Sequence, residues 1–215
     1  MKILKKDTLK DGGFAGIREH RLIVDKSIGG RSDTFDGLGN LVYLADAYFE
    51  PFGQTNMHSH KNIDVISVFL EGDVDHEGSL NNKVTLKQNQ VQVQKSGKVG
   101  FIHNEINPNE KKSHIIQIWV IPQDVKDEST YELYDLKQGN ITTIYGSDDI
   151  NTHLEVASLN KNQKISKDGK FQLYITKGKA KINGVIIDQF TLIEDTTLEL
   201  EALSDITQVI IISKK

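Results

Sequence analysis

Short segments in which apolar and polar residues alternate recur along this sequence, and they limit its fold more than any other feature. Alternation with period two is typical of half-buried strands, because successive side chains of a strand point to opposite faces. Glycines and an Asn183-Gly184 pair, a favoured hairpin turn, separate these segments. We therefore predict an all-β fold with at most a short helical turn near 124–128. The predicted strands cover residues 41–49, 63–70, 84–94, 114–121, 171–176, 179–182 and 207–212.

Two stretches with a strand, glycine, strand pattern indicate an internal repeat. VFLEGDVDHEG contains Gly72 and YITKGKAKING contains Gly178, an offset of 178 − 72 = 106 residues. Two β-barrels of about 100 residues fit a chain of 215 residues. We place the boundary in the polar stretch QDVKDEST, which gives an amino-terminal domain over 1–124 and a carboxyl-terminal domain over 125–215. The alternative is one domain with a long β appendage.

Composition narrows the classes of function. The chain has no cysteine, which excludes disulfides and thiolate metal ligands. The first residues, MKILKKDTLKD, lack the apolar core of a signal peptide, and no segment reaches transmembrane length. We therefore expect a cytoplasmic protein. The net charge of −4 disfavours direct binding to nucleic acid, which requires clustered Lys and Arg.

Two short motifs carry candidate metal ligands. In MHSH, His58 and His60 are two residues apart, so on a strand both imidazoles point to one face. In FIHNEIN, His103 and Glu105 repeat this spacing. Two such pairs on neighbouring strands inside a barrel can converge on a single cation.

Three imidazoles and one carboxylate would leave two open positions on an octahedral ion. A site that binds dioxygen or a bidentate substrate needs such positions. A divalent ion with one carboxylate keeps a net charge of +1, which favours a deprotonated phenol or enol as a further ligand. Fe(II) is our first choice, and Mn, Co, Ni, Cu and Zn stay open because these ligand types do not discriminate among them.

Each pair alone is weak evidence, because H-x-H and H-x-E also arise by chance. Their joint occurrence, with a glycine turn before each pair and a strand between them, favours a site. Asp64, four residues after His60, is a candidate acceptor for an imidazole N–H on the same face of that strand. It is equally well a carboxylate without a role. We expect the remaining histidines to be surface or satisfied core residues: His20, His76, His114 and His153.

At these residues the sequence resembles the pirin family of bicupins. The resemblance covers about residues 52–122, in FGQTNMHSHKNIDVISVFLEGDVDHEGSLNN, VQVQKSGKVGFIHNEIN and HIIQIWVIP. It implies two cupin-type β-barrels in tandem, an architecture grouped with the double-stranded jelly rolls. It also implies one metal ion in the amino-terminal barrel, held by His58, His60, His103 and Glu105. Some members of the family are iron-dependent quercetin 2,3-dioxygenases, and others are described as transcriptional co-regulators.

The sequence departs from the family pattern at several positions near the motifs. Ser59 and Lys61 stand where proline and arginine are common, and Asp64 stands where a glutamate is usual. Asn89 and Gln90 replace a Gly-Asp turn. These changes concern substrate choice and activity more than metal binding.

Applying the 106-residue offset puts Lys164, Ser166 and Val209 at the positions of the three histidines. The second barrel is therefore expected to lack metal ligands and to act as a structural cover.

Our leading hypothesis is an Fe(II)-dependent dioxygenase that binds a flavonol and dioxygen, with Glu105 as a metal ligand that also accepts the substrate's hydroxyl proton. We expect a monomer. The alternatives are a non-enzymatic redox regulator that acts through a protein partner, and a bicupin that binds no metal. Dioxygen uptake with quercetin would support the enzyme.

Overall fold

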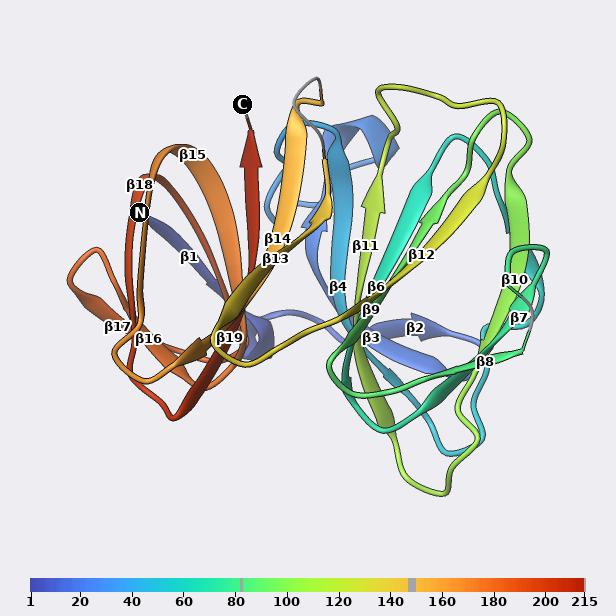
Figure 1. Ribbon diagram of the computed structural model, residues 1–215, viewed down its shortest axis with the longest axis horizontal. Helices are drawn as coiled ribbons and strands as arrows, with labels where there is room; N and C mark the ends of the chain where they lie inside the picture. The colour runs from blue at the N-terminus through green and yellow to red at the C-terminus, as the bar shows by residue number, and fades with distance from the viewer. Residues whose placement is uncertain (82, 147–149, 215) are drawn as a thin grey trace. The chain divides into compact units, whose positions relative to one another are not determined.

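The computed structural model describes residues 1–81, 83–146 and 150–214, and β-strands make up most of them (Figure 1). The predicted all-β class is confirmed. Two short 3-10 helices, η1 (Lys6–Thr8) and η2 (Lys26–Ile28), accompany the strands. The strands are β1 (Lys2–Lys5), β2 (Gly12–Phe14), β3 (Ile17–Val24), β4 (Leu41–Phe49), β5 (His58–His60), β6 (Asp64–Glu71), β7 (Val74–Gly78), β8 (Val84–Leu86), β9 (Gln90–Lys95), β10 (Phe101–Ile106), β11 (Ser113–Val120), β12 (Thr130–Asp135), β13 (Asn140–Tyr145), β14 (Thr152–Asn160), β15 (Lys164–Lys177), β16 (Lys179–Ile182), β17 (Val185–Asp188), β18 (Thr191–Ala202) and β19 (Ile206–Lys214).

The chain divides into two compact units. The amino-terminal unit covers Leu9–Asp135, and the carboxyl-terminal unit combines Met1–Thr8 with Leu136–Lys215. This division differs from the predicted boundary after residue 124, because β12 pairs along the whole of β9 and so belongs to the first unit. The first residues belong to the second unit because β1 pairs with β18. Sequence patterns show neither long-range pairing.

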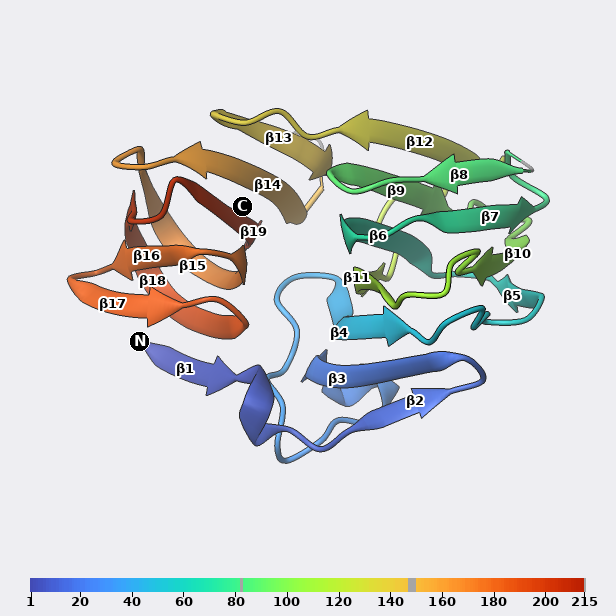
Figure 2. The same ribbon diagram turned by 90° about the horizontal axis from the view of Figure 1, so that it is seen from below.

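The amino-terminal unit is built from two sheets. The larger has the order β12-β9-β6-β11-β4-β3-β2, and the smaller, whose strands are neighbours in Figure 2, has the order β5-β10-β7-β8. Apolar side chains of both sheets meet in one buried cluster, in which Val74 and Leu86 of the smaller sheet join Phe49, Phe69 and Ile115 of the larger. Two antiparallel sheets with a shared core form the cupin-type barrel.

This cluster identifies the inner face of the larger sheet. Ile115 lies in the cluster, so alternation along β11 puts Gln117 and Trp119 on the same inner face. The register aligns Gln117 with Ser67 on β6, and Ser67 with Gln92 on β9. The inner face therefore changes from apolar to polar along the strands, and the polar part surrounds the candidate site.

The carboxyl-terminal unit has one eight-stranded sheet in the order β13-β14-β19-β15-β18-β16-β17, with β1 also paired to β18. Its buried cluster includes Phe171, Leu173 and Ile211. The predicted hairpin turn joins β16 to β17, with positive φ angles of 49° at Asn183 and 84° at Gly184, as a type I′ turn requires.

Several predicted strands agree with the structure and two details do not. The segment 41–49 is β4, whereas 84–94 divides into β8 and β9, because Asn89 adopts a left-handed conformation with φ 64° between them. The helical turn predicted near 124–128 is wrong. These residues form bends, and the backbone N–H of Lys98 donates to the carbonyl of Lys126.

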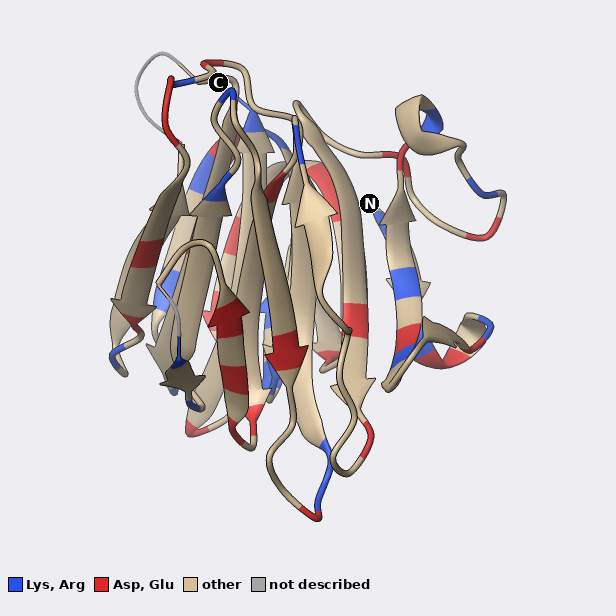
Figure 3. Ribbon diagram, turned by 90° about the vertical axis from the view of Figure 1, so that its right-hand side faces the viewer, with Lys and Arg blue, Asp and Glu red and all other residues tan. Residues whose placement is uncertain are grey.

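Neither helix in the described part of the chain has the length or the apolar character needed to span a bilayer. Acidic and basic residues are interspersed over the strands that face the viewer in Figure 3, in keeping with a net charge of −4.

Candidate metal centre

The two predicted ligand pairs lie on adjacent strands. Antiparallel pairing of β5 with β10 puts His103 opposite His58 and Phe101 opposite His60. Residues opposite or two apart share a face of the sheet. The local pairing therefore brings the imidazoles of both motifs together on the inner face of the barrel.

The turns around β5 determine where its histidines lie. Asn56 and Asn62, on either side of the strand, have φ angles of 62° and 60°, and asparagine accepts this left-handed conformation better than most residues. The carbonyl of Asn56 lies 2.8 Å from Nδ1 of His58. Because a carbonyl can only accept, Nδ1 carries the proton and Nε2 of His58 keeps a free lone pair.

His58, His60 and His103 form the one group of three potential metal-binding side chains found among the described residues. Their ligand atoms all lie within 4.8 Å of one another, and Nε2 of His58 is 3.1 Å from Nε2 of His103. Two nitrogens about 2.1 Å from a shared ion, at a right angle, are about 3.0 Å apart. Nε2 of His60 is buried and has no hydrogen-bond partner. The three residues therefore fit a transition-metal ion.

Burial keeps two of these imidazoles neutral, which is the form that binds metal. It lowers the pKa of His60 to about 4, with a smaller contribution from the charge of His58. It lowers the pKa of His103 to about 2, and the neighbouring His58, His60 and His76 add to this effect. At neutral pH neither His60 nor His103 has to lose a proton before it binds a cation.

Glu105, the fourth predicted ligand, is fully buried on β10 but is not a member of the histidine group. One carboxylate oxygen, Oε1, accepts hydrogen bonds from Ser67 Oγ at 3.2 Å and from Gln92 Nε2 at 2.9 Å. Oε2 has no partner. Burial raises the pKa of Glu105 to about 7, although the two hydrogen bonds oppose this shift.

A second group of buried polar side chains, formed by His76 and Gln94, lies next to His103. His76 is buried on β7, with its ring centroid 5.6 Å from that of His103 and 5.5 Å from that of Tyr131. Its Nδ1 lies 3.2 Å from the carbonyl of Asn81, and its Nε2 accepts from Nε2 of Gln94 at 3.2 Å. His76 is therefore a satisfied core residue, as predicted.

Sequence analysis missed the partners Ser67, Gln92 and Gln94. The signal that could have found them is the run QVQVQK in β9, where glutamines alternate with valines that are also buried. Both faces of β9 are covered, so its glutamines lie in the barrel interior rather than in solvent.

Asp64 lies on a different strand from His60, so the predicted shared strand is wrong. β5 ends at His60 and a new strand, β6, begins at Asp64. The buried Asp64 carboxylate accepts from the backbone N–H of Ser96 at 2.8 Å and from its hydroxyl at 3.3 Å.

The other three histidines lie outside the group. His114 on β11 is buried, with Nε2 2.9 Å from Asp46. His20 on β3 forms a 2.8 Å pair with Asp11. Nε2 of His153 on β14 is buried without a hydrogen-bond partner.

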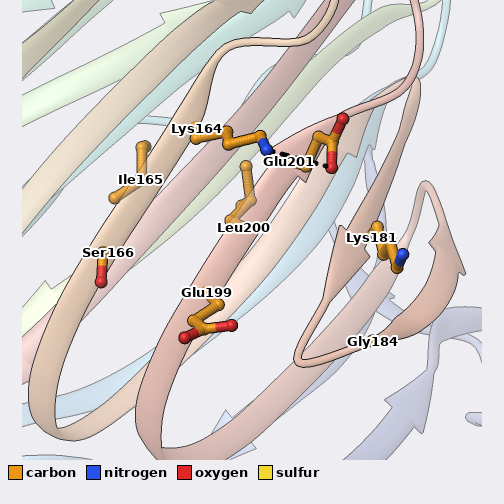
Figure 4. Close-up of a pocket in the computed structure, with 8 residues that line it drawn as sticks. All are labelled: Lys164, Ile165, Ser166, Lys181, Gly184, Glu199, Leu200 and Glu201. Atoms are coloured by element: carbon orange, nitrogen blue, oxygen red, sulfur yellow. Dashed lines mark ion pairs between the residues drawn. The ribbon is translucent and has the colours of Figure 1, made fainter.

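The carboxyl-terminal unit has a cavity of about 360 Å³ on β15, β16 and β18 (Figure 4). Lys164 and Ser166, aligned by the sequence repeat with the first two histidines, are among its lining residues, and Nζ of Lys164 lies 3.8 Å from Glu201. This wall carries lysine, serine and glutamate rather than imidazoles. That the second unit binds no metal stays a prediction.

Fold and site together define a bicupin whose amino-terminal barrel carries three convergent histidines on its inner face. Residues 38–120 match the family model described as Pirin. A quercetin 2,3-dioxygenase of Escherichia coli O157:H7 is 27% identical over 188 residues, which are 80% of this chain and 81% of that protein. Residues 38–120 of this chain thus match the Pirin family model, and most of the chain is similar to a protein named quercetin 2,3-dioxygenase.

Solved structures agree on the fold. The bacterial pirin YhhW of Escherichia coli, in complex with nickel(II), has a TM-score of 0.82 at 19% identity, covering 99% of this chain and 98% of that one. A quercetin 2,3-dioxygenase of Acinetobacter baumannii has a TM-score of 0.72 at 16% identity, covering 100% of this chain and 86% of that one.

Proposed function

We propose that this chain binds one divalent transition-metal ion and is a 2,3-dioxygenase for quercetin or a similar flavonol. The observation that carries the proposal is the convergence of His58, His60 and His103, with the unpartnered Oε2 of Glu105 two residues further along β10. The names of the relatives support the choice of substrate. Fe(II) is the ion we propose, in a cytoplasmic protein.

The bound ion would supply a Lewis acid with open positions for oxygen donors. The three histidines would hold it as neutral ligands, and Glu105 is proposed as the fourth ligand. The two ligand pairs lie on the short β5 and the adjacent β10, on the inner face of the barrel, so a substrate would reach the ion from the barrel interior.

Glu105 is also the proposed proton acceptor. A flavonol has to lose its enol proton before that oxygen can bind a cation as an anion, and the buried carboxylate two residues from His103 is the acceptor that we propose. The O–H bond of the substrate would break and its proton would move to the Glu105 carboxylate. Gln92 and Ser67 hold Oε1 meanwhile, so that Oε2 stays directed to one place.

Metal content and dioxygen uptake test the proposal together. Protein purified without chelator or metal-affinity resin should contain about one metal ion per chain and consume dioxygen with quercetin. A variant with both His58→Ala and His60→Ala should lose both properties, whereas His20→Ala should keep them. Metal without dioxygen uptake would instead favour the redox regulator, and wild-type protein without metal would overturn the proposal.

A further inference from the structure

A second feature of the amino-terminal barrel adjoins the histidines. A cavity of about 300 Å³ lies on the inner face of the larger sheet, with Phe14, Glu19, Arg21, Tyr43, Gln117 and Trp119 among its lining residues. A protein cavity of roughly half this volume encloses a benzene molecule. The cavity therefore has room for about one or two aromatic rings.

Strand register places a short side chain beside the cavity. Ala45 on β4 is aligned with Arg21 on one neighbouring strand and with Gln117 on the other. Ala45 belongs to one packed cluster with the lining residues Val24, Tyr43 and Trp119. A larger side chain at this position would therefore press on the cavity wall.

One wall of the cavity is also a wall of the candidate metal centre. Tyr43 and Trp119 stack with their ring centroids 4.4 Å apart and an angle of 23° between the planes. The ring of Trp119 lies edge-on to that of His60, at 6.0 Å. A ligand in the cavity would thus lie one side chain away from the histidine group.

A buried ion pair holds part of the cavity wall in place. Glu19 is only 4% exposed, and it accepts from Nε of Arg21 at 2.8 Å and from the hydroxyl of Tyr43 at 2.7 Å. A second nitrogen of Arg21, Nη2, lies 2.7 Å from the same carboxylate. Both oxygens of Glu19 are therefore occupied, and this acid has little capacity left for a ligand.

Two residues of the cavity wall keep N–H donors that are not used by Glu19. Nε1 of Trp119 is buried, has no partner and can only donate. The guanidinium of Arg21 has further N–H groups beyond those directed at Glu19, and its side chain is 37% exposed. The cavity thus offers aromatic faces together with donors, a combination suited to a planar ligand with acceptor oxygens.

We infer that this cavity binds an oxygenated aromatic ring of the substrate, next to the part of the substrate held at the histidines. The assignment rests on the proposed function for the identity of the substrate. Trp119 is the residue that joins the two parts. Its ring packs on Tyr43, and its N–H donates to a keto or phenolic oxygen of the ligand.

Flavone is the probe for the cavity alone, because it has the ring system and the keto oxygen but lacks the adjacent hydroxyl needed to chelate a metal. Trp119 is the single tryptophan of the chain, so its fluorescence reports on the cavity directly. We expect saturable quenching by flavone in metal-free protein, and a dissociation constant within about threefold after metal is restored.

Two variants test the residues. Ala45→Leu enlarges a side chain that packs with the lining residues Tyr43 and Trp119, and should weaken flavone binding at least about tenfold. Trp119→Phe keeps a ring but removes the N–H, and should weaken binding about three- to tenfold, measured by calorimetry. Tyr131→Phe is the control, because it changes a tyrosine of the same barrel that does not line the cavity. If Ala45→Leu does not fold, Trp119→Phe decides.

The outcomes separate the cavity from the activity. Unchanged flavone affinity in the folded cavity variants, or no binding by wild-type protein, would overturn the assignment. Flavone binding without dioxygen uptake from quercetin would leave the cavity standing and remove the proposed function. Quercetin oxidation with an unchanged KM in both variants would leave the proposed function standing and overturn the cavity assignment.

Discussion

Glu105 has two hydrogen-bond donors on one oxygen and none on the other, inside a barrel that excludes water. A buried carboxylate in this state is costly to ionise, and its pKa of about 7 expresses that cost. A cation at the adjacent histidines would reverse the balance, because it favours the charged form. Glu105 should therefore destabilise the metal-free protein and stabilise the metal-bound one.

The pH dependence of the stability of the Glu105→Gln variant tests whether Glu105 destabilises the metal-free protein. The pKa in the folded state lies above its ordinary value of 4.5, so the folded state binds the extra proton between pH 4.5 and 7. The contribution of Glu105 to stability is therefore greatest at low pH and is lost as the pH rises through 7. We expect the variant to match wild type near pH 5 and to be more stable by up to about 3 kcal/mol at pH 8.

Denaturant unfolding at the two pH values measures the difference, and saturating metal should reverse its sign at pH 8. A constant difference across the pH range would contradict a raised pKa for Glu105.

At the scale of elements, the pairing of β10 with β5 and β7 determines the geometry of the candidate metal centre. Gly78 on β7 is opposite His103, and a Cβ at Gly78 would lie 2.2 Å from the Ile102 carbonyl oxygen and 2.9 Å from Cα of His103. Only glycine allows β7 and β10 to approach this closely.

Gly78→Ala should therefore push His103 out of place. We expect metal affinity, measured by chelator competition, to fall at least about tenfold and the free energy of unfolding to fall by about 2 kcal/mol. Gly12→Ala is the matched control, since its Cβ would meet nothing closer than 3.5 Å. Equal metal affinity in both variants would show that this close approach does not position the centre.

At the scale of elements, the alternation of apolar and polar residues predicted where most strands lie but not which strands pair. The spacing of His58, His60 and His103 was enough to place three imidazoles on one face, because the period of a strand is a local property. The hydrogen bonds to Glu105 depend instead on the register of β6 and β9 against distant strands, which alternation alone does not give. For the same reason the stretch 84–94 was predicted as one strand, although Asn89 interrupts it.

At the scale of the whole molecule, metal should act on one unit alone. All the proposed ligands lie within Leu9–Asp135, and a ligand that binds only the folded state stabilises the structure that holds it. In hydrogen exchange, metal should slow the amides of β5 and β10, by about 100-fold at a free metal concentration 100 times the dissociation constant. Amides of β14 and β19, in the other unit, serve as the internal control and should keep their rates. Uniform slowing in both units would contradict a local centre.

Removing β1 should change hydrogen exchange in the carboxyl-terminal unit and leave the metal centre unchanged. Lys2–Lys5 pair with Thr191 to Glu194 on β18, so a chain that lacks residues 1–5 should expose that edge and exchange faster there. Its metal content should equal that of wild type. Lys2→Ala is the control, because it removes side-chain interactions such as the exposed ion pair with Glu194 but keeps the backbone of β1. Loss of metal from the shortened chain would contradict the division of the units.

The pairing of β1 with β18 also has a consequence for the order of events during synthesis. β1 leaves the ribosome well before its partner β18, which ends at Ala202, whereas the amino-terminal unit is complete once Asp135 has emerged. The interval is 202 − 135 = 67 residues, or about 3 to 13 s at about 5–20 residues per second. The amino-terminal unit of a nascent chain would thus have several seconds in which to fold before all of β18 has emerged.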